Sequence, residues 1–300
     1  MCVCVAFFAM QYRGEKDSEQ RQLLVLWMRS VAAYNHRDVD EEDLDRLDAL
    51  NLGNLFKERC PKEFRVTFWE MAGSVARFMP QLRTLDLSDS DLDALPDEIA
   101  LFTNLEVLEL SNNCFSVVPD VVTRLKKLAK LSFMYNKLEV VPPEIGNLEW
   151  LKDLNLCCNR LSELPVDFSR LQALETLALT SNRFSVFPVE IAELVNLEAL
   201  YLADNPFSTL PGELEKLSKL KHLYLGGPNL KVSAEVIEKI FSLAVLRLDS
   251  NQQMIHPKGT THLTQLTCFV RATGTVYYTR PEYEHWVNCP EVNWALWERH

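Results

Sequence analysis

The residues best suited to covalent chemistry are two adjacent cysteines, Cys157 and Cys158, and a histidine further along the chain, His222. A thiol becomes a nucleophile when an imidazole within hydrogen-bond reach accepts its proton. The other histidines show no metal-ligand spacing alongside cysteines, and no C-x-x-C pair occurs. The sequence also lacks H-E-x-x-H, G-x-S-x-G and the Gly-rich phosphate-binding loops. The elements that carry Cys157, Cys158 and His222 therefore decide whether catalysis is possible.

These residues belong to an internal repeat, which defines the elements that position them. Blocks of the form L-x-x-L-x-L-x-x-N-x-L recur every 23 residues without an insertion. The blocks start at Leu82, Leu105, Leu128, Leu151, Leu174, Leu197, Leu220 and Leu243. A second motif, [LVF]-P-x-x-[IVLF], follows each of the earlier blocks, as in LPDEI from Leu95 and FPVEI from Phe187. A fixed period of roughly 20–50 residues indicates a repeat architecture, in which each unit buries its apolar face against its neighbours.

This pattern resembles the leucine-rich repeat family, and in particular the intracellular subclass with 23-residue repeats found in Ras-suppressor, Ras-scaffold and Scribble-type proteins. The resemblance covers roughly residues 79 to 263. It implies an α/β-type repeat fold, a leucine-rich-repeat solenoid with parallel strands on the concave face and irregular or helical segments on the convex side. It also implies work as a signalling scaffold, with a small GTPase or a phosphatase signalling component as the partner.

The residue types inside one block account for the strand and for its end. Leu154 and Leu156 alternate with Asp153 and Asn155, which is the period of a half-buried strand. An asparagine stands where the chain leaves the strand, and its amide can satisfy unpaired backbone groups of the turn. The residues of this series are Asn113, Asn136, Asn159, Asn182, Asn205 and Asn251. The recurring proline then starts the return segment, because it fixes φ and donates no hydrogen bond.

Both ends of a solenoid need caps, because they otherwise expose its core. Ser18–Tyr34 is apolar nearly all round and predicts a buried helix, and Asp40–Leu50 predicts a second helix. Leu266–Val276 fits a degenerate last unit, and Trp294 and Trp297 predict packing in a C-terminal cap. We therefore expect an N-terminal helical region and cap over 1–63, a repeat solenoid over 64–265, and a degenerate last repeat with a Trp-containing cap over 266–300.

The strand positions between the leucines are expected to face solvent and to tile the concave face. Tyr201 and Tyr224 hold the fifth position of adjacent units, so strand spacing predicts that they lie about 4.8 Å apart. Exposed tyrosines with an arginine nearby have the composition of an interface hot spot. The candidate partner-binding residues run from an acidic amino end to an aromatic and basic carboxyl end, and they are Asp86, Glu109, Met134, Tyr135, Asn155, Tyr201, His222, Tyr224 and Arg247.

The same spacing argues against catalysis. Cys157 and Cys158 lie three strands away from His222, roughly 14 Å, which exceeds the hydrogen-bond reach that activation of a thiol requires. The two cysteines are then best interpreted as small strand residues. We expect no enzymatic activity, no catalytic residue, no cofactor and no metal site.

A short motif upstream of the repeats predicts a second mode of binding. Arg65–Phe68 reads RVTF and resembles the R/K-V-x-F motif with which regulatory proteins dock onto protein phosphatase 1. Such docking adds an extended segment to a sheet edge, with Val66 and Phe68 filling pockets and Arg65 completing the motif. The alternative stays open that Phe64, Val66 and Phe68 alternate because they form a buried first strand.

Composition limits the compartment and the kind of partner. The net charge of −11 argues against a nucleic-acid or anionic-membrane surface. The sequence has no N-x-[ST] site, no disulfide-scaffold density and no apolar stretch long enough to span a bilayer. We expect a cytoplasmic, non-catalytic scaffold for protein binding and signal transduction, with its partner on the concave face. The alternatives are a phosphatase 1 regulatory subunit and a ubiquitin-ligase substrate adaptor.

Overall fold

The computed structural model describes Gln22, residues 48–53, residues 76–231, Val236, and residues 245–248, 268–271 and 276–277. The chain divides into two compact units, Met1–Leu151 and Lys152–His300. Both units are built from the same repeat, in which a short strand is followed by a loop and then by a 3₁₀ helix. The predicted leucine-rich-repeat solenoid is thereby confirmed as the fold.

The first unit contains four strands that pair in parallel and in chain order. The strands are β1 (Ala49–Asn51), β2 (Thr84–Asp86), β3 (Val107–Glu109) and β4 (Lys130–Ser132). Their register aligns the same leucine of successive blocks, because Leu108 lies opposite Leu85 and Leu131 lies opposite Leu108; Leu50 of β1, which precedes the first block, lies opposite Leu85. The 3₁₀ helices of this unit are η1 (Asp97–Leu101), η2 (Asp120–Arg124) and η3 (Pro143–Asn147).

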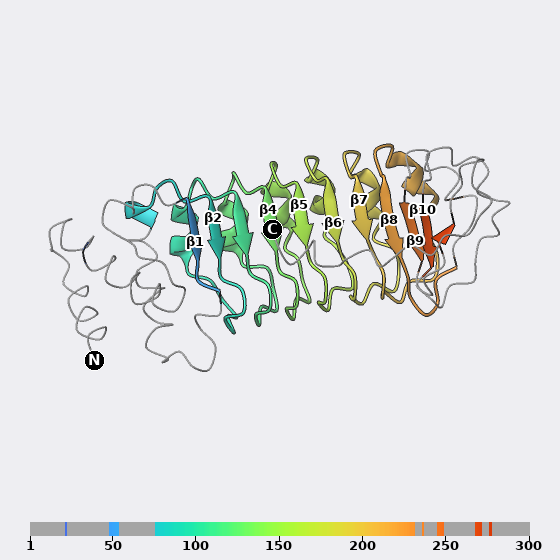
Figure 1. Cartoon of the computed structure of the whole chain (residues 1–300), viewed down its shortest axis with the longest axis horizontal. Coiled ribbons are helices and arrows are strands. Elements are labelled where there is room, and N and C mark those ends of the chain that lie inside the picture. The colour runs from blue at the N-terminus through green and yellow to red at the C-terminus, as the bar shows by residue number, and fades with distance from the viewer. Residues whose placement is uncertain are drawn as a thin grey trace. The chain divides into compact units, whose positions relative to one another are not determined.

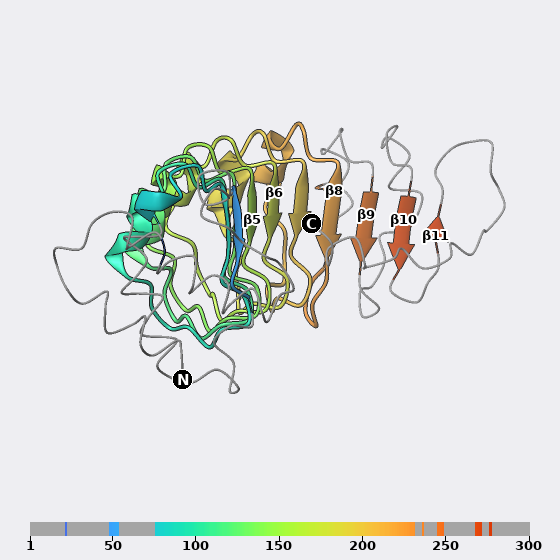
Figure 2. The same cartoon turned by 60° about the vertical axis from the view of Figure 1, so that its left-hand side comes forward.

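The second unit continues the same arrangement and ends in a hairpin. Its strands are β5 (Asp153–Asn155), β6 (Thr176–Ala178), β7 (Ala199–Tyr201), β8 (His222–Leu225), β9 (Val245–Leu248), β10 (Cys268–Arg271) and β11 (Val276–Tyr277). Figure 1 shows β5, β6, β7 and β8 side by side and pointing the same way. Strand β11 runs against β10, as the opposite arrows in Figure 2 show. The 3₁₀ helices are η4 (Val166–Arg170), η5 (Val189–Glu193) and η6 (Gly212–Lys216).

The core consists of rows of identical apolar positions. Leu154, Leu177 and Leu200 are completely buried, and each belongs to a neighbouring strand of the second unit. A leucine surrounded by the leucines of the adjacent repeats buries more apolar surface than one repeat can bury alone. Each 3₁₀ helix begins directly after a proline whose φ lies between −63° and −76°. The predicted role of the proline as the start of the return segment is confirmed.

The asparagine at the strand exit joins adjacent repeats through buried hydrogen bonds. In the second unit, the Asn182 amide donates to the carbonyl oxygens of Leu156 in the preceding repeat and Leu179 in its own, at 2.9 and 3.0 Å. Its Oδ1 accepts the backbone N–H of Leu161 at 3.0 Å. Asn136 makes the equivalent bonds in the first unit, to Leu110 and Phe133 at 2.9 and 3.0 Å. These amides satisfy backbone groups, as the sequence predicts.

The residue before the strand-exit position, which is Ser90 in the first block and asparagine in the next five, adopts a left-handed backbone conformation. Its φ lies between 54° and 57° in Asp89, Asn112, Tyr135, Cys158, Ser181 and Asp204. In the seventh block the turn is altered, and a Cβ on Gly227 would lie only 2.1 Å from the Asn205 carbonyl oxygen. The GGPN departure from the repeat pattern at residues 226–229 therefore supplies glycine where no side chain fits.

The described residues at the two ends of the strand series bear on the expected caps. The helix expected over Asp40–Leu50 is wrong at its end, because β1 begins at Ala49 and pairs with β2. At the other end, β10 pairs in parallel with β9 and places Phe269 opposite Leu246. The degenerate last repeat and cap expected over 266–300 stay a prediction. Apart from Gln22, which is helical, the predicted helix at Ser18–Tyr34 lies outside the described residues, as do Trp294 and Trp297.

Candidate functional site

The side chains that alternate with the core leucines form the outward surface of the sheet, at the third, fifth, seventh and eighth positions of each block. We call this surface the strand face. Its residues vary from one repeat to the next, whereas the leucines and asparagines beneath them recur. The fold therefore does not require particular residue types on the strand face.

In the first unit the strand face contains four of the candidate residues. Asp86 is half-buried, and its Oδ1 accepts the backbone N–H and the hydroxyl of Ser88 at 2.9 and 2.6 Å. Glu109 and Met134 are half-buried, and Tyr135 is 56% exposed. Asp86 thus holds its own turn, while Tyr135 presents most of its side chain to solvent.

In the second unit two tyrosines stack on the strand face. Tyr201 in β7 and Tyr224 in β8 lie opposite each other in the register. Their ring centroids are 4.6 Å apart, and the ring planes meet at 21°. The predicted spacing is confirmed, because equivalent positions of adjacent parallel strands are separated by about 4.8 Å. Stacking at this distance contributes roughly 0.5–1.5 kcal/mol beyond the burial of area.

The surroundings of Tyr201 are poor in solvent. Burial raises the pKa of Tyr201 to about 12, and smaller contributions come from Tyr224, from the carboxylate of Asp153 and from Cys157. The next residue in the row, Ala178 in β6, is 4% exposed. Asn155 is also buried, and its Oδ1 accepts the backbone N–H of Cys157 at 3.0 Å. Asn155 therefore stabilises the turn after β5 and offers little surface to a partner.

His222 and Arg247 lie on the strands that follow. Burial lowers the pKa of His222, and so does the positive charge of Lys221, while Glu198 acts in the opposite direction. At neutral pH the imidazole is therefore uncharged. Arg247 lies in β9 opposite Tyr224 in the register. His222 therefore does not supply the basic character expected at this end of the strand face.

The cysteines do not form a nucleophile with His222. Cys157 follows β5 and His222 lies in β8, so β6 and β7 separate them. Burial raises the pKa of the Cys157 thiol to about 12, with a smaller contribution from Cys158. The Cys157 thiol is therefore protonated at neutral pH and is a weak nucleophile. Cys157 and Cys158 act as small residues of the strand face.

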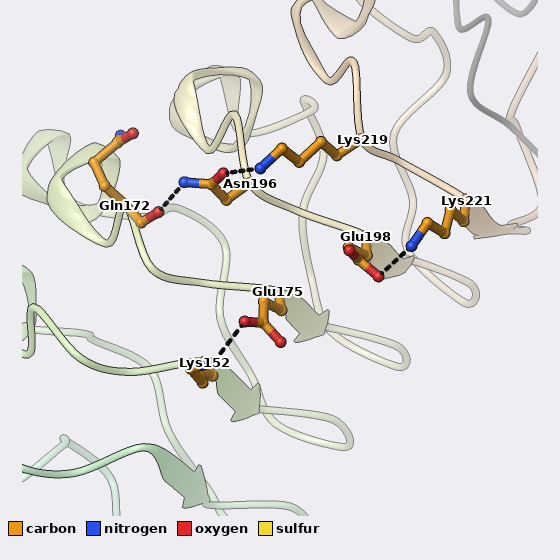
Figure 3. Close-up of polar contacts among 7 residues, drawn as sticks. All are labelled: Lys152, Gln172, Glu175, Asn196, Glu198, Lys219 and Lys221. Carbon is orange, nitrogen blue, oxygen red and sulfur yellow. Dashed lines mark hydrogen bonds and ion pairs between the residues drawn. The ribbon is translucent and has the colours of Figure 1, made fainter.

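A ladder of polar contacts lies at the edge of the sheet where the chain enters each strand (Figure 3). Lys152 bonds to Glu175, and Lys221 bonds to Glu198, each at 2.8 Å between neighbouring repeats. These residues hold the second position of their blocks, which sequence reasoning assigned to the concave face. The opposite signs 23 residues apart could have indicated the pairing. Each exposed pair contributes about 0.2–1 kcal/mol.

A second chain of contacts runs beside these ion pairs. The side-chain amide of Asn196 donates to the backbone carbonyl of Gln172 at 2.7 Å, and its oxygen accepts a hydrogen bond from Lys219 at 2.6 Å (Figure 3). Asn104 does the same in the first unit, between Pro80 and Lys127, at 2.7 and 2.6 Å. The polar groups of this edge are thus engaged between repeats.

Other candidates lie away from the strand face or outside the described residues. Trp150 is 67% exposed and was missed by sequence reasoning, although asparagine or lysine holds its position in four of the other repeats. Arg65, Val66 and Phe68 of the RVTF motif lie outside the described residues. Within the part of the chain that the structure describes, no group of histidine, cysteine or acidic residues has a metal-binding arrangement. Among the same residues, no helix is long and apolar enough to cross a membrane.

Comparison with known proteins identifies the family. The model of a leucine-rich repeat region matches residues 28–160 and 143–253, which together make up most of the chain. This protein belongs to the leucine-rich repeat family. Among curated protein sequences, none matches it significantly. The family is typically a non-enzymatic binding scaffold whose members bind protein partners.

Solved structures of other leucine-rich repeat proteins have the same fold. The protein LIC12759 of Leptospira interrogans is 26% identical, with a TM-score of 0.58, over 76% of this chain and 67% of that one. The plant peptide hormone receptor RGFR1 in complex with RGF2 is 34% identical, with a TM-score of 0.52, over 64% of this chain and 32% of that one. The ectodomain of the receptor kinase GASSHO1/SCHENGEN3 from Arabidopsis thaliana is 26% identical, with a TM-score of 0.56, over 74% and 26% of the two chains. The matched region thus spans about a third or less of these two plant receptor chains.

Membership of the family divides the residues of each repeat by role. Leucines, asparagines and prolines recur because they build the leucine-rich repeat unit. The stacked tyrosines of β7 and β8 are not required by that unit, since other repeats have alanine, asparagine or serine at the same position. They are accordingly the described residues best suited to a task other than folding.

Proposed function

We propose that this leucine-rich repeat protein is a non-catalytic scaffold that binds a protein partner on its strand face, in intracellular signalling. The observation that carries the proposal is the Tyr201–Tyr224 stack, a half-buried aromatic surface on the strand face. Tyrosine is enriched at interface hot spots because it combines a large apolar ring with a hydrogen-bonding hydroxyl. The stack holds both rings in one geometry before binding, which reduces the entropy lost on association.

The signalling context rests on resemblance and composition. The repeat length and the proline-containing motif resemble those of Ras-suppressor, Ras-scaffold and Scribble-type proteins, which supports a partner in small-GTPase signalling. Cysteines without a disulfide-scaffold spacing support a reduced, cytoplasmic compartment. A similar structure is a plant peptide hormone receptor in complex with RGF2, which supports the capture of a polypeptide by this fold.

The test is affinity purification with matched variants of the full chain, followed by mass spectrometry. Tyr201→Ala combined with Tyr224→Ala should abolish capture of the partner that the wild-type chain enriches. Val166→Ala combined with Val189→Ala is the control, because these valines are exposed at the start of η4 and η5, away from the strand face. The control should capture the partner normally. Unchanged capture by a folded tyrosine double variant would refute the proposal.

A further inference from the structure

We propose that Tyr135 anchors a basic segment of the protein partner on the strand face of the first unit. An apolar residue of that segment contacts Tyr135, and a lysine or arginine lies toward the carboxylates two repeats away. The inference rests on the proposed function, since it assumes that the strand face binds a polypeptide. It goes further by naming an anchor residue and the chemistry that the partner segment presents.

Tyr135 has a backbone conformation that does not suit its side chain. Its φ is 55°, in the left-handed region that bulky residues rarely adopt. The other repeats place smaller residues with φ between 54° and 57° at this eighth position, and these are Asp89, Asn112, Cys158, Ser181 and Asp204. Aspartate and asparagine adopt this conformation more readily than tyrosine does. The turn therefore does not explain why a tyrosine stands at position 135.

Packing in the core does not explain the tyrosine either. Its side chain is 56% exposed, whereas the aromatic residues Phe115 and Phe133 of the same unit are completely buried. A residue that keeps a strained conformation without a core role is typical of binding sites. Met134, which precedes Tyr135, is half-buried, and its thioether adapts to apolar groups of different shapes. Tyr135 and Met134 thus offer an apolar contact surface to a partner.

Backbone hydrogen bonds hold the eighth positions of the first unit in one row. The Asp89 N–H donates to the Ser111 carbonyl oxygen at 2.9 Å, and the Asn112 N–H donates to the Met134 carbonyl oxygen at 2.7 Å. These bonds join neighbouring repeats, so Asp89, Asn112 and Tyr135 follow one another at strand spacing, about 4.8 Å. The backbone positions of Tyr135 and Asp89 are therefore about 10 Å apart, a distance that an extended polypeptide covers in about three residues.

The charges on this part of the strand face favour a basic partner segment. The charged residues that the structure describes there are Asp86, Asp89, Glu109 and Lys130, and the adjoining tenth positions add Asp91 and Lys137. The Asp86 carboxylate accepts hydrogen bonds from Ser88, which is a neutral donor. The Asp89 carboxylate accepts one from the neutral amide of Asn112, so both carboxylates keep their charge. A partner lysine or arginine is therefore attracted to this end of the row, whereas an acidic segment is repelled.

The test uses the full chain labelled with ¹³C at methionine methyl groups and probed with capped hexapeptides. The probe is Gly-Trp-Ser-Ser-Arg-Gly, which carries an apolar and a basic residue three positions apart. Two comparison peptides replace its arginine by glutamate or its tryptophan by serine. The Met134 methyl signal should shift saturably with the probe, and the Kd should be about fivefold lower than for either comparison peptide. The methyl signal of Met79, which is 1% exposed in the same unit, is the reference that should not move.

Variants separate anchoring from a role in the fold. Tyr135→Gly should raise the Kd of the probe about fivefold without lowering the thermal midpoint, because glycine removes the ring but relieves the backbone. Ser181→Gly is the matched control, since φ is 57° at the same position of a repeat in the second unit. It relieves the backbone in the same way without removing an aromatic ring, and it should change the Kd by less than about twofold.

Three results would overturn the inference. The first is a Met134 signal that does not move or an equal Kd for the three peptides. The second is an unchanged affinity of Tyr135→Gly for the probe. The third is a lower thermal midpoint of Tyr135→Gly, because the tyrosine would then be retained for the fold.

The inference and the proposed function fail in different ways. If the variant with Tyr201→Ala and Tyr224→Ala loses its protein partner while Tyr135→Gly binds the probe as the wild-type chain does, only the inference is refuted. If partner capture is unchanged in that double variant, the proposed function itself is refuted. The two experiments use different variants and different readouts, so neither result can be mistaken for the other.

Discussion

The asparagine ladder predicts a large loss of stability from one small substitution, Asn182→Ala. Asn182 is 7% exposed, and its side chain satisfies the backbone N–H of Leu161 and the carbonyl oxygens of Leu156 and Leu179. Alanine leaves all three backbone groups buried without these partners. Each such group costs about 1–3 kcal/mol when left unsatisfied. Because the space vacated by the amide can admit water, we expect a total loss of about 3–5 kcal/mol.

That loss is a large fraction of the stability of an ordinary domain, which is about 5–15 kcal/mol. The assay is urea unfolding of the full chain, followed by far-ultraviolet circular dichroism, together with hydrogen exchange at the Leu161 amide. The local exchange measurement is needed because repeat proteins depart from two-state unfolding. The Leu161 amide should exchange faster by a factor that corresponds to the lost free energy.

The matched control is Asn229→Ala, because Asn229 is an exposed asparagine in a loop of the same unit. It should change the unfolding free energy by less than about 0.5 kcal/mol. Asn182→Asp is a second comparison, since it retains an acceptor for Leu161 but removes the amide donors. A loss below about 1 kcal/mol for Asn182→Ala, or a loss equal to that of the control, would show that the ladder does not stabilise the repeats.

Further predictions concern the edge ladder, the titratable groups and the strained turn. Lys221→Ala should lower the unfolding free energy by at most about 1 kcal/mol, because its ion pair with Glu198 is exposed. The effect should disappear at high salt, and a larger loss that persists in salt would contradict this prediction. Folding lowers the pKa of His222 and so favours its neutral form. The unfolding free energy should therefore fall as the pH drops below about 6.5, the ordinary pKa of histidine, and His222→Gln should remove this effect. An NMR titration midpoint of His222 above about 6.5 would reverse the sign of the effect. Cys157 should resist iodoacetamide at pH 7.5 because burial raises its pKa to about 12, and peptide mapping that finds it rapidly alkylated in the folded chain would refute this. Tyr135 has a φ of 55°, a left-handed conformation that glycine adopts at less cost than other residues. Tyr135→Gly should therefore raise the unfolding free energy by about 0.5–1 kcal/mol and raise the thermal midpoint. A lower midpoint would show that the Tyr135 side chain stabilises the fold.

Most of the fold could be predicted because the same buried and exposed positions recur in every repeat. Leu154, Leu177 and Leu200 repeat at one interval, so one correct assignment of a buried strand position fixes the others. The same logic placed Tyr201 beside Tyr224, since equal positions in parallel strands are neighbours. Periodicity therefore predicted not only the core but also the spacing within the candidate site.

The features that were not predicted do not recur at the repeat interval. Strand β1 was read as the end of a helix, because Leu47 and Leu82 are not separated by the repeat interval. The burial of Asn155 follows from its bond to the turn after β5, which alternation along a strand does not encode. The pairing of Lys152 with Glu175 was missed because the second position was treated as part of the binding surface. Each miss concerns a local contact that differs from one repeat to the next.

The most direct test of the central claim is site-specific photo-crosslinking of the full chain to its partner. Benzoylphenylalanine replaces Tyr224 on the strand face in one variant and Val189, which is exposed at the start of η5, in the other. If the strand face binds the partner, crosslinked product should form from position 224 and not from position 189. Crosslinking from position 189 alone would place the partner elsewhere and contradict the proposed function.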